Sequence, residues 1–394
     1  MKDVALYNGL TWDHPRGFDP LDAAAQNLES RGAEIRVRWH KQKLEGFESH
    51  PIADLANLYD LVIIDHPCLG EVAAEECFIP IDDLFGKEES DLWCQSSVGP
   101  SWSSYHYAGK QWALPLDAAT QVCVVKPEII QKDLWPQTWD DVLRLCDHYP
   151  VSLSLAGPHA LLSFFSICAG IAGEESQPEP DGIFAEAICL QGYEILAALY
   201  AKTVKTHVDS NPIALLDAMA SSSQIALCPL VYGYVNYASQ SKTAVCEPLA
   251  FINAPRLSER LKPRSTVGGT GLAVSRKTTV TPPLLDHIRY LMSSAYQVDF
   301  SPGHGGQPSS GQAWEDPAVN ARANGFYRDT FATMSHAWVR PRYKGYVEFQ
   351  AEGSAYLRDA LSAGVSPRVV TRKIRVMFNE SRALHLASEE GFHV

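Results

Sequence analysis

The segment from Thr11 to Gly17 carries four side chains that can bind a polar ligand. They are Trp12, Asp13, His14 and Arg16. Aromatic rings stack on the C–H faces of sugars, carboxylates accept hydrogen bonds from hydroxyls, and a guanidinium pairs with a carboxylate through two parallel bonds. Each residue also has an ordinary structural explanation, because a loop carboxylate can cap the next turn and a tryptophan can cover a core edge. This segment is the first candidate for ligand contact.

The other candidates follow later predicted strands. Asp65 and His66 come directly after an apolar run, and Asp117 follows the sequence Leu114–Leu116. Glycines allow backbone N–H groups to approach a ligand closely, although most of them serve turns. Neither a GxGxxG nor a P-loop pattern is present, which argues against phosphate binding. The remaining candidate ligand contacts are Tyr232, Tyr234, Asn236, Gly268, Gly269, Gly305 and Gly306.

Strands alternating with helices are expected to position these residues. Val4–Leu6 and Ala33–Trp39 read as strands, Asp19–Arg31 has helical spacing, and Tyr59–Ile64 is a continuous apolar run typical of a buried strand. This alternation predicts an α/β fold with a sheet covered on both faces. In such sheets, ligands bind beyond the carboxyl ends of the strands, where the segments 11–17 and 65–70 lie.

The second half of the chain repeats the alternation. Thr138 and Asp141 have the spacing of a capping box, which predicts a helix beginning there. Helices are expected from there to about Ala220 and again after Pro317. Further expected elements are strands at Gln121–Val125, Gln224–Leu230, Leu249–Ile252 and Gly271–Val274, and a helix at Leu284–Gln297.

Length and charge exclude several classes of protein. A chain of 394 residues exceeds the size at which one core keeps growing, so two lobes are expected. The net charge of -13 disfavours nucleic acid and anionic membrane surfaces as partners. The longest apolar stretch, Ala160–Ala172, is shorter than the roughly 20 residues that cross a bilayer, so it is expected to be a buried helix.

Nine scattered cysteines, none in a CxxC pattern, predict no zinc site, no redox motif and no disulfide. No cofactor is expected. So many free thiols suit a reducing compartment. The apolar run Val4–Leu6 is too short for the core of a signal peptide. We therefore expect a cytoplasmic protein for the sequence as it stands, and a periplasmic one if a leader has been removed.

Four groups of motifs resemble, in order and spacing, those of the extracellular solute-binding proteins that serve carbohydrate ABC transporters. They are Tyr59–Asp65 with Ile79–Leu84, Gly109–Pro115 with Thr138–Asp141, Gln224–Tyr234, and Gly268–Ser275 with Gly305–Pro308. The resemblance covers most of residues 1–380. It implies a two-lobed type II periplasmic-binding-protein-like fold with a hinge and an interlobe ligand cleft, and an ABC permease as a partner.

On this basis we expect one lobe from residues 1–115 and 256–304. The other lobe is expected to comprise residues 116–255 and 305–394, including C-terminal helices. The chain is expected to cross between lobes near residues 114–118, 247–256 and 300–308.

Two functions from different classes remain open. The first is binding of a sugar or sugar acid by hinge closure, for transport or as a cytoplasmic ligand-binding homologue. The second is a cytoplasmic enzyme on the same scaffold, an isomerase or lyase acting on a hydroxylated acid. Its acid and base, or the oxygen and nitrogen ligands of a divalent metal, would come from Asp13, His14, Asp65, His66 and Asp117.

The charge of Arg16 bears on the ligand. Burying an unpaired charge is expensive, so Arg16 pairs either with an internal carboxylate, such as Asp65 or Asp117, or with an acidic group of the ligand. The second alternative predicts a ligand that carries both hydroxyls and a carboxylate.

Overall fold

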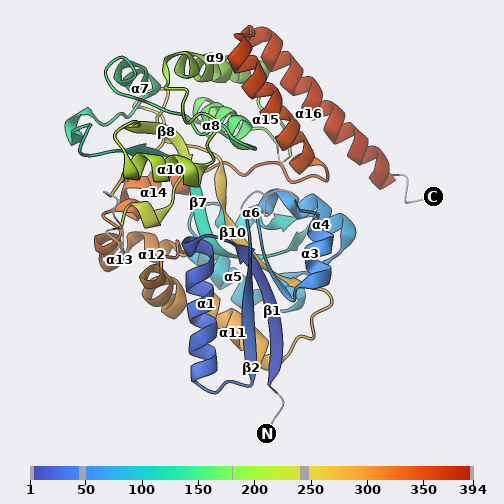
Figure 1. The fold of residues 1–394 in the computed structure, drawn as a ribbon. Coiled ribbons are helices and arrows are strands. Elements are labelled where there is room, and N and C mark those ends of the chain that lie inside the picture. Colours follow the sequence, from blue (N-terminus) through green and yellow to red (C-terminus); the bar gives the residue numbers. More distant parts are fainter. Residues whose placement is uncertain (1–3, 44–49, 180, 240–247, 391–394) are drawn as a thin grey trace. The chain divides into compact units, whose positions relative to one another are not determined.

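The computed structural model describes residues 4–43, 50–179, 181–239 and 248–390, with side chains described as far as residue 384. Its chain divides into two compact units, whose elements are labelled in Figure 1. Cys246, one of the nine cysteines, lies outside the described residues. Unit 1 comprises Met1–Ala118, Tyr234–Asn236 and Gly268–Asn320, and unit 2 comprises Ala119–Gly233, Tyr237–Val267 and Ala321–Val394.

Unit 1 contains a mixed sheet. The strand β1 (Ala5–Trp12) lies between β2 (Ile35–Gln42) and β3 (Leu61–Ile64) and is parallel to both. The strand β10 (Val267–Ser275) runs antiparallel to β3 and also pairs with β4 (Phe78–Ile79). Because β1 and β3 are parallel, the residues that follow them lie at the same edge of the sheet.

Both faces of this sheet are buried, as the apolar run at residues 59–64 predicts. Leu61 and Ile63 of β3 face one core with α1 (Pro15–Ser30) and α11 (Pro282–Met292). Val62 and Ile64 face a second core with α3 (Ile52–Leu58) and α4 (Leu69–Glu75). The period of two along a strand explains this division. The other elements of unit 1 are α5 (Lys87–Ser96), α6 (Ser101–Ser104), α12 (Gly311–Glu315) and the hairpin strands β5 (His106–Tyr107) and β6 (Lys110–Gln111).

Unit 2 has a smaller sheet. The strand β7 (Leu114–Val125) enters unit 2 at Ala119 and pairs antiparallel with β8 (Leu227–Tyr232) and β9 (Ala250–Ile252). The helix α13 (Pro317–Arg322) contains the last passage from unit 1 to unit 2. The helices of unit 2 are α7 (Trp139–Leu145), α8 (His159–Ala172), α9 (Glu186–Lys202), α10 (Pro212–Ser221), α14 (Phe326–Ser335), α15 (Tyr346–Ala363) and α16 (Pro367–Glu390).

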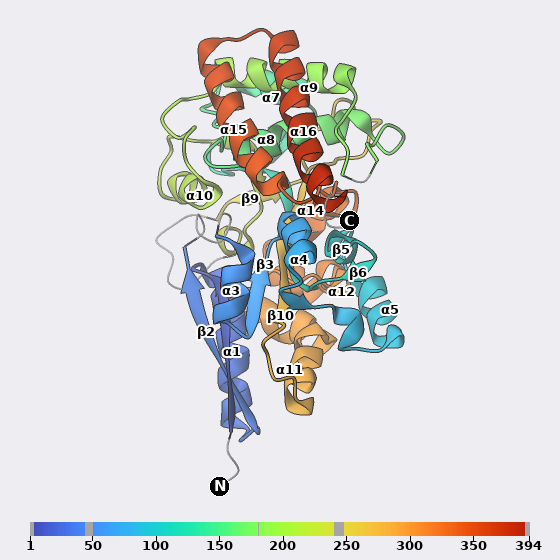
Figure 2. The same ribbon diagram turned by 90° about the vertical axis from the view of Figure 1, so that its right-hand side faces the viewer.

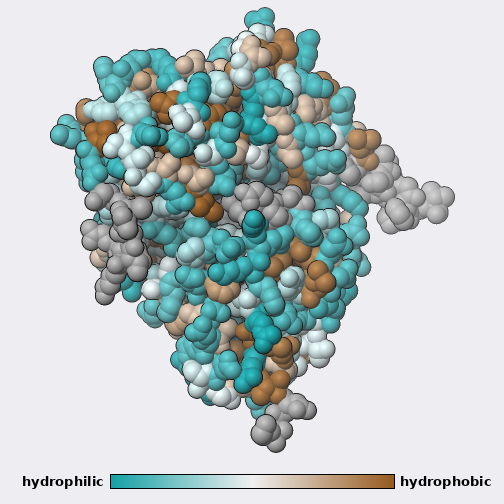
Figure 3. Space-filling model, in the orientation of Figure 1, coloured by the Kyte–Doolittle hydropathy of each residue, from teal (hydrophilic) through white to brown (hydrophobic). Residues whose placement is uncertain are grey.

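The helices α8, α9, α15 and α16 pack together around the core of unit 2. Contacts join α8 to α9 and α15, and α16 to α9 and α15; Figure 2 shows α15 and α16 side by side. Every residue of α8 except Ile171 is buried, which confirms the expected buried helix at Ala160–Ala172. No helix in the described part of the chain is both long and apolar enough to cross a membrane. The face drawn in Figure 3 is mainly hydrophilic, with apolar residues scattered over it.

The predicted capping box is present in α7. Thr138 Oγ1 accepts from the N–H of Asp141, and the Asp141 carboxylate accepts from the N–H of Thr138 at 2.9 Å.

Two further segments each belong to one unit. Residues 256–267 lie in unit 2, where Arg256 N donates to Gln137 O. Residues 305–320 lie in unit 1, where Ser97 bridges Ser310.

Candidate functional site

The predicted loop at residues 11–17 is the end of a strand followed directly by the start of a helix. The strand β1 runs to Trp12 and α1 begins at Pro15, four residues before the expected start. His14 is the N-cap, and its Nδ1 accepts from the N–H of Arg16 at 3.1 Å. Proline at the first helical position has a backbone angle that suits a helix. Arg16 is therefore held rigidly in the first turn of α1.

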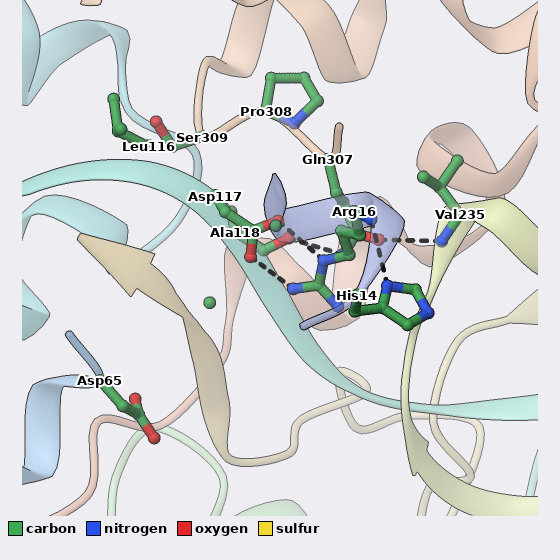
Figure 4. Close-up of polar contacts among 12 residues, drawn as sticks. His14, Arg16, Asp65, Leu116, Asp117, Ala118, Val235, Gln307, Pro308 and Ser309 are labelled. Carbon is green, nitrogen blue, oxygen red and sulfur yellow. Dashed lines mark hydrogen bonds and ion pairs between the residues drawn. The ribbon is translucent and has the colours of Figure 1, made fainter. Parts of the chain in front are cut away.

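Arg16 pairs with Asp117 inside unit 1. Arg16 Nε donates to Asp117 Oδ2 at 2.7 Å, and Nη2 donates to Oδ1 (Figure 4). The two side chains are only 4% and 9% exposed. Burial raises the pKa of Asp117, and the guanidinium opposes that shift. Of the two expected partners of Arg16, an internal carboxylate or a ligand carboxylate, the structure shows the internal one, Asp117. The charge of Arg16 therefore no longer argues for an acidic ligand.

Aromatic rings flank this ion pair. The Arg16 guanidinium carbon lies 4.6 Å from the ring centre of Tyr234 and 6.0 Å from that of Trp12. The ring of His14 meets the ring of Tyr234 edge-on at 4.8 Å. These distances suit cation–π attraction, which is strengthened by burial. Trp12 is 3% exposed and packs within the core of unit 1.

His14 is neutral over the ordinary pH range. Burial, assisted by the charge of Arg16, lowers its pKa from 6.5 to about 3. Because Nδ1 accepts from the Arg16 N–H, the neutral ring carries its proton on Nε2. His14 is therefore a fixed hydrogen-bond donor through Nε2 rather than a group that titrates near neutrality.

Gln307 is a central residue that the sequence analysis missed. Its Nε2 donates to Ala118 O at 2.8 Å, and its Oε1 accepts from Val235 N at 3.0 Å. Its own carbonyl accepts from Ala118 N at 3.1 Å. Gln307 therefore joins the end of the unit 1 part of β7 to the segment 234–236 (Figure 4). In the sequence, Gln307 is a glutamine between a glycine and a proline, and no motif marks it as a functional residue.

The candidate glycines have structural contacts in unit 1. Gly305 has a φ of 81°, and its carbonyl accepts from Asn236 Nδ2 at 3.1 Å. A Cβ on Gly306 would lie 2.1 Å from Ser301 Oγ, so a larger residue there would displace the Ser301 side chain. The carbonyl of Gly269 accepts from the hydroxyl of Tyr105 at 3.2 Å, while Gly268 begins the unit 1 part of β10. Their predicted role in ligand contact stays a prediction.

Asp65 and His66 are not part of the Arg16 cluster. Figure 4 shows Asp65 apart from His14, Arg16 and Asp117. Asp65 accepts from the backbone N–H of His66 at 2.9 Å, and its Oδ1 lies 3.1 Å from Nδ1 of the buried His66 ring. Asp13 is exposed and lies 3.3 Å from Lys41 Nζ. The acid–base groups of the enzyme hypothesis are therefore not gathered at one place in unit 1.

Metal coordination has no cluster to support it in the part of the chain that the structure describes. Within those residues, no three His, Cys, Asp or Glu side chains are grouped as metal ligands. The enzyme hypothesis itself stays a prediction.

Tyr232 belongs to unit 2, whereas Tyr234 and Asn236 belong to unit 1. The hydroxyl of Tyr232 lies 3.2 Å from Thr266 Oγ1 and donates to Val267 O at 3.3 Å. Thr266 Oγ1 is in turn 3.0 Å from Ser166 Oγ, which donates to Gln121 Oε1 at 2.6 Å. Such a connected, buried polar network holds each side chain in one orientation. Tyr232 is thus fixed through hydrogen bonds that its sequence position alone did not reveal.

A small cavity of about 20 Å³ lies beside the ion pair within unit 1. That space suits about one water molecule and is far too small for a sugar. Its lining includes Trp12, Arg16, Asp117, Thr270 and Gln307. The cavity therefore does not by itself form a sugar site.

Solved structures resemble this chain along almost its whole length. Maltose-bound MalE3 of T. maritima is 13% identical with a TM-score of 0.79, covering 95% of this chain and 99% of that one. The GacH receptor of Streptomyces glaucescens, solved unliganded and with acarbose, is 14% identical with a TM-score of 0.77, covering 96% and 98%. An ABC transporter solute-binding protein from Agrobacterium radiobacter in complex with ribitol is 16% identical with a TM-score of 0.72, covering 97% and 99%.

No protein-family model and no curated protein matches the sequence. The structural likeness establishes a two-lobed type II periplasmic-binding fold. It thereby confirms the predicted α/β class and the fold that the sequence motifs resemble.

Proposed function

We propose that this chain binds a small neutral ligand rich in hydroxyl groups, a sugar or a sugar alcohol, by hinge closure. Its fold supports the proposal, because the three similar structures carry maltose, acarbose and ribitol. Hinge closure needs no catalytic group. The ligand stabilises the closed state by binding it more tightly than the open state.

The observation that carries the choice of a neutral ligand is the buried pair of Arg16 and Asp117. Both charges are satisfied within the protein, through bonds from Nε and Nη2 of the guanidinium. A ligand carboxylate would have to compete with Asp117 for Arg16 and would leave a second buried anion beside it. A neutral ligand avoids that cost.

The groups around the ion pair suit hydroxyls. The neutral His14 ring offers an Nε2–H donor, and Tyr234 adds an aromatic ring beside it. Polar groups of this kind, set among aromatic side chains, are typical of sites for small polar ligands. We assign ligand contact in unit 1 to His14 and Tyr234, with Arg16 and Asp117 positioning them.

The experiment compares neutral sugars with their acids. Isothermal titration calorimetry of the full chain uses maltose, glucose and ribitol, each against the matching aldonic acid. We expect a neutral compound to bind and its acid to bind at least tenfold more weakly. Tighter binding of the acid would contradict a neutral ligand, and native mass spectrometry of ligand retained through purification provides an independent identification.

The cellular setting is also proposed. The high cysteine content supports a reducing compartment and hence a cytoplasmic ligand-binding protein. An ABC permease is the proposed partner if the chain is exported. Fractionation of cells with an antibody against the native chain separates these alternatives, because an exported protein is recovered outside the cytoplasmic fraction.

A further inference from the structure

Two cysteines of unit 2 lie side by side on neighbouring helices. Cys168 is in α8 and Cys189 is in α9, and both are fully buried. Cys168 Sγ lies 3.9 Å from the carbonyl oxygen of Ile188, the residue that precedes Cys189. Each of the two thiols also affects the pKa of the other. The chain thus brings together two sulfurs that are 21 positions apart (189 − 168).

Gly192 makes this approach possible. It lies three residues after Cys189 on the same helix, and a Cβ added to it would lie 2.6 Å from Cys168 Sγ. A side chain at position 192 would therefore push the Cys168 sulfur out of its place. The missing side chain lets α8 and α9 pack closely at the level of the two thiols.

The two thiols differ in their surroundings. The hydrogen bond with Cys168 lowers the pKa of Cys189 against the effect of burial, and the guanidinium of Arg375 on α16 lowers it further. Arg375 Nη1 also donates to the carbonyl of Phe184, which accepts from Cys189 Sγ at 3.4 Å. Burial raises the pKa of Cys168. Because the thiolate is the reactive form and the Arg375 guanidinium shares the Phe184 carbonyl with Cys189, Cys189 is the nucleophile of the pair.

We propose that Cys168 and Cys189 form a redox pair that closes to a disulfide under a peroxide oxidant and stays reduced in a reducing compartment. This inference does not depend on the proposed ligand. It also differs from the expectation that all cysteines remain free, because the pattern of cysteines in the sequence does not reveal which ones meet in space.

The oxidation has two steps. The Cys189 thiolate attacks one oxygen of hydrogen peroxide, the O–O bond breaks, and a sulfenic acid and hydroxide form. The Cys168 sulfur then attacks the Cys189 sulfur, the S–O bond breaks, and the sulfenic oxygen leaves as water with the thiol proton. In sum, two thiols and one peroxide become one disulfide and two waters.

The test treats the folded full chain with hydrogen peroxide and maps its peptides without reduction. No Lys or Arg lies between residues 145 and 201, so trypsin leaves both cysteines on one peptide. Glutamyl endopeptidase separates them, because it cleaves after Glu174 and Glu186. We expect a linked pair of peptides carrying Cys168 and Cys189, which dithiothreitol releases, and a loss of two thiols from the denatured protein.

Variants make the assignment specific. Cys168→Ala should abolish the linked peptide, whereas Cys146→Ala, in the same unit, should leave it unchanged. Oxidised wild-type protein should melt at a higher temperature than reduced protein, and this difference should vanish in Cys168→Ala. Gly192→Ala should slow formation of the link, because it displaces the Cys168 sulfur. Absence of the link in peroxide-treated wild-type protein, equal linking of Cys146 to Cys189, or an unchanged rate in Gly192→Ala would overturn the proposal.

Discussion

At the scale of single residues, the buried pair of Arg16 and Asp117 places two opposite charges inside unit 1. Such a pair adds little to the stability of the fold compared with an apolar pair of the same volume. Removing one partner, however, leaves the other charge buried without its counterion, which is strongly destabilising. The sequence predicted Arg16 and Asp117 as candidates and named Asp117 as a possible partner. It did not predict which carboxylate Arg16 meets, because 101 positions separate the two residues (117 − 16) and only the fold joins them.

Asp117→Asn should destabilise the protein by about 3 kcal/mol or more, because the Arg16 charge then loses its counterion in a buried place. Urea unfolding followed by circular dichroism measures this free energy. The control is Asp13→Asn, whose exposed ion pair with Lys41 is worth less than about 1 kcal/mol. The double variant Arg16→Met with Asp117→Leu should recover most of the loss. Equal effects of the Asp117 and Asp13 single variants would contradict a buried ion pair at Asp117.

Two buried histidines make stability depend on pH. Burial lowers the pKa of His14 to about 3 and that of His287 to about 4, both from 6.5. In the unfolded chain these two histidines become protonated below pH 6.5. In the folded chain they stay neutral until the pH approaches about 3 for His14 and about 4 for His287. The free energy of unfolding should therefore fall as the pH decreases below 6.5, by up to about 1.4 kcal/mol per pH unit for each histidine.

Urea unfolding at pH 7.5, 6 and 5 measures this dependence. His14→Asn should make it shallower while keeping an acceptor at the N-cap of α1. His50→Asn, at an exposed position, is the control for removing a histidine. An identical slope in His14→Asn and wild-type protein would show that His14 titrates in the same way in both states.

At the scale of elements, strands and caps were more predictable than the start of α1. The buried β3 and the capping box of α7 follow from local patterns, an apolar run and the spacing of Thr138 and Asp141. The predicted start of α1 at Asp19 was wrong, because proline and glycine, here Pro15 and Gly17, are typical of loops. In the structure Pro15 occupies the first helical position, and Gly17 lets the helix lie against the ring of Trp12. That second reason depends on a tertiary contact, which the local pattern does not contain.

Gly17→Ala should therefore destabilise the protein by about 1–3 kcal/mol, although alanine favours helices elsewhere. A Cβ at position 17 would lie 2.4 Å from the Trp12 ring, so the helix or the ring must shift. The matched control is Gly86→Ala, because nothing lies within 4 Å of a Cβ there. Thermal unfolding of both variants checks the prediction, and a Gly17→Ala variant as stable as wild-type protein would exclude the tight contact.

At the scale of the whole molecule, each unit is assembled from segments that are distant in the sequence. The shortest is Tyr234–Asn236, which belongs to unit 1 although unit 2 residues flank it on both sides. Gln307 holds it through the N–H of Val235, and the carbonyl of Gly305 holds Asn236. The order of the sequence motifs predicted the fold, but not this three-residue segment. Nothing in its composition distinguishes it from its neighbours, because its ties to unit 1 are contacts with residues distant in the sequence, namely these hydrogen bonds and the ring contacts of Tyr234 with Arg16 and His14.

The proposed hinge closure of a chain built from two units leads to a prediction about ligand binding. If a neutral sugar closes the hinge, it binds the folded protein and not the unfolded chain, so it must raise the free energy of unfolding. At a ligand concentration of 100 times Kd, the increase should be about 2.7 kcal/mol. Closure also makes the molecule more compact, so small-angle X-ray scattering should give a smaller radius of gyration with the ligand identified by calorimetry than without it. The matching aldonic acid at the same concentration serves as the control and should raise the free energy of unfolding by no more than about 1.4 kcal/mol, the value for a ligand that binds tenfold more weakly. A saturating sugar that raises stability but leaves the radius of gyration unchanged would show binding without closure, because a ligand that holds both states equally shifts neither.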